Sequence, residues 1–168
     1  HHDRLSDDSR GAEARAIYER FRGGVNRAAR TILRFGMIKQ IFVYGTLMID
    51  GLHADLLPRR RDVKPLGPAR CRGRLYDLGP FPALVLEGRT WVAGELYRAD
   101  AIEDILATLD PLERESGLER ALLAVRWRLG ETEAWGYVAR AVPAGAALIA
   151  SGSYKARLRE IRDGEGRG

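Results

Sequence analysis

Glu113 is the strongest candidate in this sequence for acid/base chemistry. It follows Leu109-Asp110-Pro111-Leu112, where a helical pattern ends and the chain heads back toward a strand-rich region. A carboxylate held near apolar side chains has its charged form disfavoured, so its pKa rises toward the range that is useful for proton transfer. The alternative interpretation is an exposed acid in the charged turn Glu113-Arg114-Glu115.

The other reactive residue types are sparse. Glu95 lies inside a strand pattern, where its alternative role is a carboxylate paired with an arginine, and His53 lies in a polar turn, where a surface or helix-start histidine is the plainer interpretation. Cys71 has no plausible histidine partner, and no Gly-x-Ser-x-Gly elbow, phosphate-binding glycine loop or zinc-ligand cluster is present. An enzyme built on this chain would therefore depend on a carboxylate, with no metal or cofactor expected.

The stretch that ends in Tyr44-Gly45-Thr46-Leu47 is the best candidate for a ligand-binding turn. Three apolar residues at 41–43 predict a short buried strand, and the Gly-Thr pair after it indicates a turn. Because glycine has no Cβ, a ligand can approach its backbone closely. Most such turns only reverse the chain, so this motif needs support from the rest of the sequence.

Strand patterns predominate in the elements that must position these residues. The expected strands lie at about 40–44, 63–78, 83–86, 91–99, 121–129 and 133–140, and the expected helices at 12–33, 52–57 and 101–109. Gly67 and Gly73 are expected to be bulges or bends in the long second strand. We expect a compact, bent or barrel-like sheet with helices packed outside it.

Several local signals predict how these elements begin and end. Glu87-Gly88 predicts a hairpin turn, Asp100 is a candidate N-cap for the helix after it, and Asp110-Pro111 predicts the end of that helix. A second hairpin is expected around Gly130-Glu131. Residues 143–153 are expected to form a loop or a short helix.

Composition and charge restrict the class of protein. The 168 residues suit one domain, and 45% hydrophobic with 30% charged residues is an ordinary globular profile without a membrane-spanning apolar run. The polar N-terminus shows no secretory signal and there is one cysteine, so we expect a cytoplasmic protein. The net charge of +5 lies in the two ends, since residues 37–154 contain 15 basic and 15 acidic residues.

The expected organisation has three parts. Residues 1–36 comprise His1-His2, typical of a tag remnant, and a helical extension whose apolar stripe must cover the domain or a second copy of the chain; a homodimer through this helix is therefore one expectation. Residues 37–154 form the main domain, and residues 155–168 form a charged, Gly-rich tail. No membrane partner is expected, and nucleic acid is not the leading partner.

The order of five short motifs resembles the gamma-glutamylcyclotransferase-like family over about residues 40–154. The motifs are Val43-Tyr44-Gly45-Thr46-Leu47, then the stretch 73–85 with Gly79-Pro80-Phe81-Pro82, then Gly94-Glu95-Leu96-Tyr97, Leu109-Asp110-Pro111-Leu112-Glu113 and Trp135-Gly136-Tyr137-Val138. Each motif is short, but their common order makes coincidence improbable. The resemblance implies an α+β fold, a small mixed β-barrel with flanking helices and a cavity at one end.

The resemblance also implies roles for individual residues. Glu113 would be the general base, the backbone N–H groups of Tyr44, Gly45, Thr46 and Leu47 would bind the α-carboxylate of the substrate, and the cavity would be lined by Tyr137 and by the turn Gly79, Pro80, Phe81 and Pro82. Two departures from the family pattern are expected at the cavity rim: Arg114 stands where a small glycine is usual, and Leu118 stands where many members have an aromatic residue.

The implied reaction is the cyclisation of a γ-glutamyl amide to 5-oxoproline with release of the free amine. The nucleophile is the substrate's own α-amine, so the enzyme needs only to hold the substrate folded and to accept a proton. Two alternatives stay open. The chain is a non-catalytic small-ligand-binding or interaction module on the same barrel, or its basic ends bind nucleic acid or another acidic partner.

Overall fold

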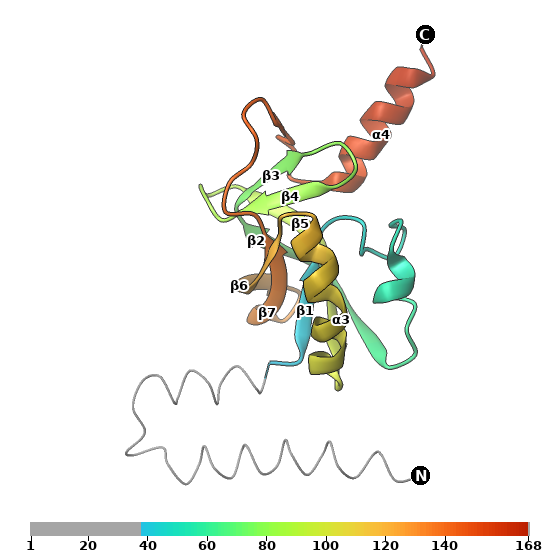
Figure 1. Cartoon of the computed structure of the whole chain (residues 1–168), viewed down its shortest axis with the longest axis vertical. Helices are drawn as coiled ribbons and strands as arrows, with labels where there is room; N and C mark the ends of the chain where they lie inside the picture. The colour runs from blue at the N-terminus through green and yellow to red at the C-terminus, as the bar shows by residue number, and fades with distance from the viewer. Residues whose placement is uncertain (1–37, 168) are drawn as a thin grey trace, which may run out of the picture. The chain divides into compact units, whose positions relative to one another are not determined.

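The computed structural model describes residues 38–167, which form an α+β domain around a closed barrel (Figure 1). The predicted fold class, a small mixed β-barrel with flanking helices, is confirmed. The predicted N-terminal helical extension at residues 1–36 lies outside the described residues, so it stays a prediction together with the dimer contact assigned to it.

Five strands close the barrel in the order β1-β5-β2-β6-β7. They are β1 (Gln40–Val43), β2 (Val63–Arg72), β5 (Trp91–Ala99), β6 (Glu119–Trp127) and β7 (Gly130–Val138). Neighbouring strands are antiparallel except at the closure, where Ile41 of β1 pairs in parallel with Trp135 of β7. The three apolar residues at the end of β1 are buried, because the strand lies between β5 and β7 and its side chains belong to the core.

A second sheet of three strands lies beside the barrel in the order β4-β3-β8. It consists of β3 (Arg74–Asp77), β4 (Pro82–Val85) and β8 (Ala147–Leu148). Gly73 separates β2 from β3 at a φ of +156°, and an added Cβ there would lie 2.7 Å from Leu84 Cδ1. The predicted bend at Gly73 and the predicted bulge at Gly67, where the β2–β5 register shifts, are therefore confirmed.

The predicted hairpin turn at Glu87-Gly88 is wrong. Strand β4 pairs with β3, whereas β5 pairs with β1 and β2 in the barrel, so the residues between them connect two sheets. The second predicted hairpin is confirmed as β6–β7, although its turn lies at 128–129, two residues before the predicted position.

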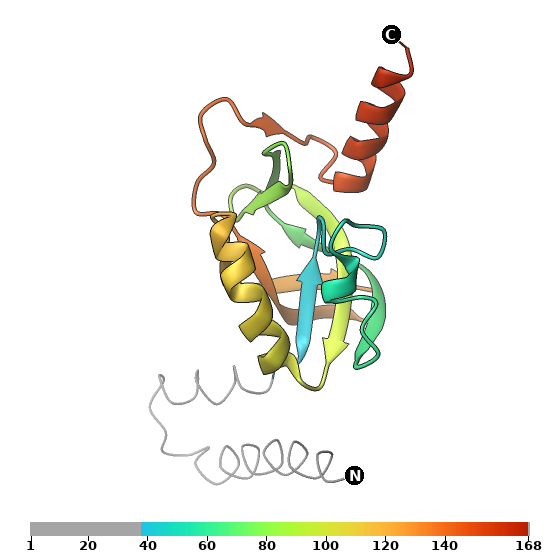
Figure 2. The same ribbon diagram turned by 45° about the vertical axis from the view of Figure 1, so that its right-hand side comes forward.

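Two helical segments belong to the site. A single 3-10 turn, η1 (Ala54–Leu56), replaces the short helix expected at 52–57, and α3 (Ile102–Glu115) packs its buried apolar face on the barrel (Figure 2). The prediction that this helix ends at Asp110-Pro111 is wrong, because the helix continues through Pro111 for four more residues. Asp100 is not the cap: Ala101 occupies the N-cap position, without a side-chain hydrogen bond.

The segment expected to be a charged tail forms the helix α4 (Tyr154–Glu165) instead. Ser153 caps it, since its Oγ accepts a hydrogen bond from the Ala156 N–H at 3.2 Å. Tyr154 is buried against the domain, and the rest of α4 projects away from the barrel in both views (Figures 1 and 2). Within residues 38–167 no helix is long and apolar enough to cross a membrane.

Candidate active site

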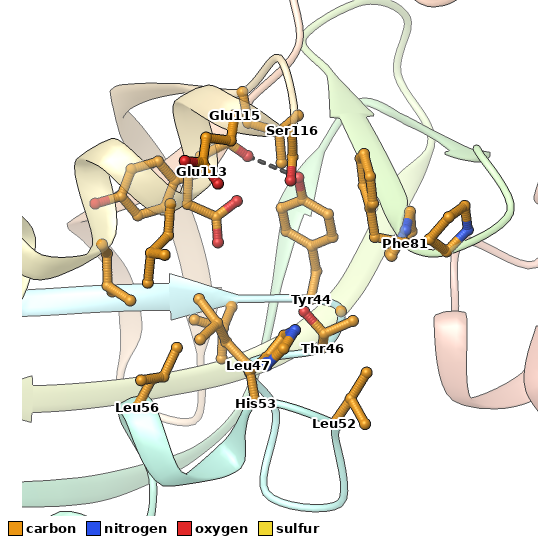
Figure 3. A pocket seen from close by; sticks show the side chains of 18 of the residues that line it. Tyr44, Thr46, Leu47, Leu52, His53, Leu56, Phe81, Glu113, Glu115 and Ser116 are labelled. Atoms are coloured by element: carbon orange, nitrogen blue, oxygen red, sulfur yellow. Dashed lines mark hydrogen bonds between the residues drawn. The ribbon is translucent and has the colours of Figure 1, made fainter.

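A cavity of about 550 Å³ opens between the end of β1, the C-terminal turns of α3 and the turn before β4. Its volume lies within the usual range of small-ligand sites, about 300–1,000 Å³. Figure 3 shows Glu113 on one wall and Leu47 and His53 on the opposite wall. The lining residues that the sequence singled out are Tyr44, Gly45, Thr46, Leu47, His53, Pro80, Phe81, Pro82, Glu113, Leu118 and Tyr137.

The helix α3 aims Glu113 into this cavity. Residues four apart lie on the same helix face, and Leu109, one turn before Glu113, is almost completely buried and also lines the cavity. If the helix ended at Pro111, Glu113 would not lie on the same helix face as Leu109. The extra turn is therefore what brings Glu113 to the ligand side of the barrel.

Burial raises the pKa of the Glu113 carboxyl group from 4.5 to about 7. Among the described residues no cation forms an ion pair with this carboxylate, so desolvation of the charged form is not offset. A carboxyl group with a pKa near 7 can accept and return a proton at neutral pH. Glu113 thus has the desolvated environment that its apolar neighbours in the sequence predict.

The turn after β1 is folded tightly by its own backbone. The Gly45 carbonyl accepts the Met48 N–H at 3.1 Å, and the Thr46 carbonyl accepts the His53 N–H at 2.8 Å. In both bonds the turn residue, Gly45 or Thr46, contributes its carbonyl oxygen and not its N–H group. Within the described part of the chain, no protein acceptor is recorded for the N–H groups of Gly45, Thr46 and Leu47. The turn can therefore offer backbone donors to an anion.

Gly45 is required by close packing against the turn before β4. A Cβ at this position would lie 2.7 Å from Cγ and 3.0 Å from Cδ of Pro82. Pro82 is itself a buried lining residue, so the glycine lets two walls of the cavity meet.

Tyr44 joins three strands through its hydroxyl group. The hydroxyl donates to the Tyr137 carbonyl oxygen at 2.7 Å and accepts the Leu84 N–H at 3.1 Å. Burial raises the pKa of Tyr44 far above its usual range, so the hydroxyl stays neutral. Tyr44 is therefore a wall residue whose polar group is committed to the fold.

Tyr137 lines the same cavity as Glu113 and is held by Asp110, a residue that was predicted only to end a helix. Its hydroxyl donates to Asp110 Oδ1 at 2.7 Å, and Asp110 Oδ2 lies 3.3 Å from Arg120 Nη2. Burial and the Asp110 carboxylate raise the pKa of Tyr137. Asp110 shares a motif with Glu113, and that shared motif is the signal that could have found it.

Two expected site residues have other positions. Gly79 is not among the residues lining the cavity; its N–H donates to Asp77 Oδ1 at 2.8 Å, so it shapes the turn that presents Phe81. Of the two departures expected at the rim, Leu118 lines the cavity and is buried, whereas Arg114 is exposed and does not line it.

Glu95, the other carboxylate candidate, lies outside the cavity. Its Oε1 accepts the Ile49 N–H at 2.7 Å and the Tyr97 hydroxyl at 2.9 Å, and its Oε2 lies 3.1 Å from Lys155 Nζ. The alternative interpretation as a paired strand carboxylate fits these contacts, with a lysine in place of the expected arginine. In residues 38–167 no three His, Cys, Asp or Glu side chains gather in an arrangement that could hold a metal ion.

Known proteins resemble this chain in sequence pattern and in fold. Residues 41–156 match the family model described as gamma-glutamyl cyclotransferase, AIG2-like. A search of curated protein sequences returned no significant match.

Three solved structures have similar folds. Bacillus subtilis YkqA is 25% identical with a TM-score of 0.61, over 74% of this chain and 42% of YkqA. Pyrococcus horikoshii PH0828 is 25% identical with a TM-score of 0.56, over 73% and 96% of the two chains. A mouse AIG2-like protein is 23% identical with a TM-score of 0.53, over 63% and 80%. The chain thus spans less than half the length of YkqA.

Proposed function

Because this chain belongs to the gamma-glutamyl cyclotransferase, AIG2-like family, we propose that it cyclises a γ-glutamyl amide or peptide to 5-oxoproline and releases the free amine. One observation carries the proposal: a desolvated carboxyl group, Glu113, with a pKa raised to about 7, faces a cavity of about 550 Å³ opposite the turn after β1. Family membership alone would leave the activity open, since related folds host binding modules as well as enzymes.

The substrate would bind folded back on itself. Its α-carboxylate would accept hydrogen bonds from the backbone N–H groups of Gly45, Thr46 and Leu47, and its α-amine would then lie near Glu113, which lines the same cavity. The apolar wall made by Phe81 and Leu118 would exclude water from the reacting atoms. Holding amine and carbonyl together supplies several kcal/mol of the barrier, since such intramolecular reactions reach high effective molarities.

Glu113 would carry protons from the α-nitrogen of the substrate to the leaving nitrogen. Its carboxylate accepts a proton from the α-ammonium group, and the freed amine attacks the γ-carbonyl carbon to form the ring C–N bond. The bond from that carbon to the leaving nitrogen then breaks as this nitrogen takes the proton from Glu113. The ring nitrogen still carries one surplus proton, which it passes through the re-formed Glu113 carboxylate to the released amine, so the amine leaves as its ammonium form. The atoms of the substrate are all found in 5-oxoproline and the released amine.

The direct test is to incubate the protein with γ-glutamyl dipeptides and γ-glutamyl alkylamines and to measure 5-oxoproline by mass spectrometry. Glu113→Gln should lower kcat by about 10²–10⁴-fold, the usual contribution of a general base. The control is Glu103→Gln, an exposed glutamate in the first turn of the same helix, which should keep full activity.

The same assay separates the proposal from a binding module. Absence of 5-oxoproline with every compound, together with tight binding of one of them, would favour the non-catalytic alternative. Equal turnover by the wild-type protein and Glu113→Gln would remove Glu113 as the base.

A further inference from the structure

A second cavity, of about 620 Å³, adjoins the first one along a shared wall. Gly45, Thr46, Leu52 and Pro80 line both cavities. The first cavity extends from this wall toward Glu113, and the second extends from it toward α4. A ligand that is bound near Glu113 can therefore extend past the shared residues into the second cavity, which residues of α4 line.

The far side of the second cavity is cationic. Lys155, Arg159 and Arg162 line it from α4, and Asp50 is the acidic residue in its lining. Lys155 is shared between Glu95 at 3.1 Å and Asp50 at 3.7 Å, so both carboxylates are engaged by the same lysine. Among the described residues no carboxylate forms an ion pair with Arg159 or Arg162.

Two exposed leucines lie along the path between the two cavities. Leu52, which lines both cavities, is 79% exposed, and Leu158 of α4 is 44% exposed in the second cavity. Exposed leucines flanking a path between two cavities are suited to contact with an aliphatic chain. A ligand on this path would contact first the Glu113 carboxyl group and then the exposed leucines. At the far end it would contact the guanidinium groups of Arg159 and Arg162, with which no carboxylate of the described residues forms an ion pair.

From this order we infer that the second cavity binds the amine part of the substrate, and that the preferred substrates are γ-glutamyl derivatives of ω-amino acids, in which an aliphatic spacer ends in a carboxylate. The inference rests on the proposed function, since the γ-glutamyl group must occupy the first cavity. The spacer lies on Leu52 and Leu158, and its carboxylate is paired with Arg159 and Arg162. Guanidinium groups suit this role because they bind a carboxylate with two parallel hydrogen bonds.

The test compares compounds that differ only at the far end of the amine part. They are γ-glutamyl-6-aminohexanoate, its neutral 6-aminohexanamide counterpart and the cationic derivative of 1,6-diaminohexane. For the wild-type protein we expect kcat/KM to be about tenfold higher for the acid than for the amide, the effect of two partly exposed ion pairs, and lowest for the cation. The difference should reside mainly in KM and should shrink in 0.5 M salt, about the range where exposed charges are screened.

The variant Arg159→Gln/Arg162→Gln should turn over the acid and the amide with equal kcat/KM. The matched control, Arg128→Gln/Arg167→Gln, removes two exposed arginines that line neither cavity and should keep the tenfold preference. γ-Glutamylglycine and its amide provide a second control. Their carboxylate is too close to the reacting bond to reach α4, so we expect no preference that depends on these arginines.

The outcomes separate this inference from the proposed function. Formation of 5-oxoproline at equal kcat/KM from acid and amide overturns the anion site and leaves the cyclisation standing. A preference that survives in the Arg159→Gln/Arg162→Gln variant also overturns it, because the carboxylate is then recognised elsewhere. Absence of 5-oxoproline from all five compounds, with the dipeptides inactive too, removes the proposed function and this inference with it.

Discussion

The buried carboxyl group of Glu113 couples the proposed chemistry to the stability of the fold. Between pH 4.5 and 7 the folded protein holds the Glu113 proton while the unfolded chain releases it. The unfolded state then binds fewer protons, so the free energy of unfolding decreases as pH rises through this interval and is constant above it. The total change is on the order of a few kcal/mol, because each pH unit in this interval corresponds to about 1.4 kcal/mol and Glu113 is only partly buried.

Replacing Glu113 by glutamine should therefore stabilise the protein at pH 8 and have little effect at pH 4.5. The amide has the shape of the carboxyl group but cannot ionise, so it avoids the cost of a buried charge. Thermal unfolding of the variant and the wild-type protein at both pH values checks this. A variant that is equally stabilised or destabilised at the two pH values would mean that Glu113 is not desolvated as described.

The same residue predicts how activity depends on pH. The proposed base must be ionised to accept a proton, so kcat/KM, which reports the free protein, should rise with pH through a pKa of about 7. The profile is measured as the initial rate of 5-oxoproline formation at substrate concentrations well below KM. Glu103→Gln should have the same midpoint as the wild-type protein, and a midpoint below pH 5 would contradict the assigned environment.

At the scale of elements, Tyr44 holds the barrel and the second sheet together. Tyr44→Phe keeps the ring but leaves the Leu84 N–H and the Tyr137 carbonyl without this partner in a buried site. The expected loss is about 1–3 kcal/mol in the free energy of unfolding. Denaturant unfolding measures it. Tyr76→Phe is the control, since no hydrogen bond of its hydroxyl is recorded among the described residues, and an equal loss in both variants would refute the assigned role.

The elements also show how far the sequence could predict this fold. Regular alternation and turn residues predicted the barrel strands and the β6–β7 hairpin, because both signals are local. The hairpin at Glu87-Gly88 was wrong because the turn residues there do not reveal which sheet each flanking strand joins. The helix end at Pro111 was wrong because burial of the α3 apolar face outweighs a local breaker.

The candidate site also has some features that the sequence could predict and others that it could not. The position of Glu113 in the cavity lining could be predicted from its motif and its apolar neighbours, and that of the turn 44–47 from its strand-Gly-Thr pattern. Asp110 as the partner of Tyr137 depends on a contact across 27 positions. The second cavity depends on α4, which was predicted as a tail because residues 155–168 are charged and rich in glycine. Contacts between distant segments are what a single sequence does not display.

At the scale of the whole described domain, Glu95 joins three segments that surround the two cavities. It lies on β5, it accepts a hydrogen bond from the loop at Ile49, and it pairs with Lys155 of α4. The Glu95 side chain is 15% exposed, so these bonds are only partly screened by water. Removal of one partner of such a group costs more than an exposed ion pair does, because the others are left unsatisfied.

Glu95→Gln should therefore lower the free energy of unfolding by about 1–3 kcal/mol and raise KM for long substrates, because the loop and α4 both lose an anchor. Its pH profile should keep the midpoint near 7, since Glu113 is unchanged. Asp50→Asn is the matched control: Asp50 contacts the same lysine at 3.7 Å but is 81% exposed, so the expected loss is below about 1 kcal/mol. Chemical denaturation and steady-state kinetics measure the two effects. A shift in the pH midpoint without loss of stability would instead identify Glu95 as a participant in proton transfer.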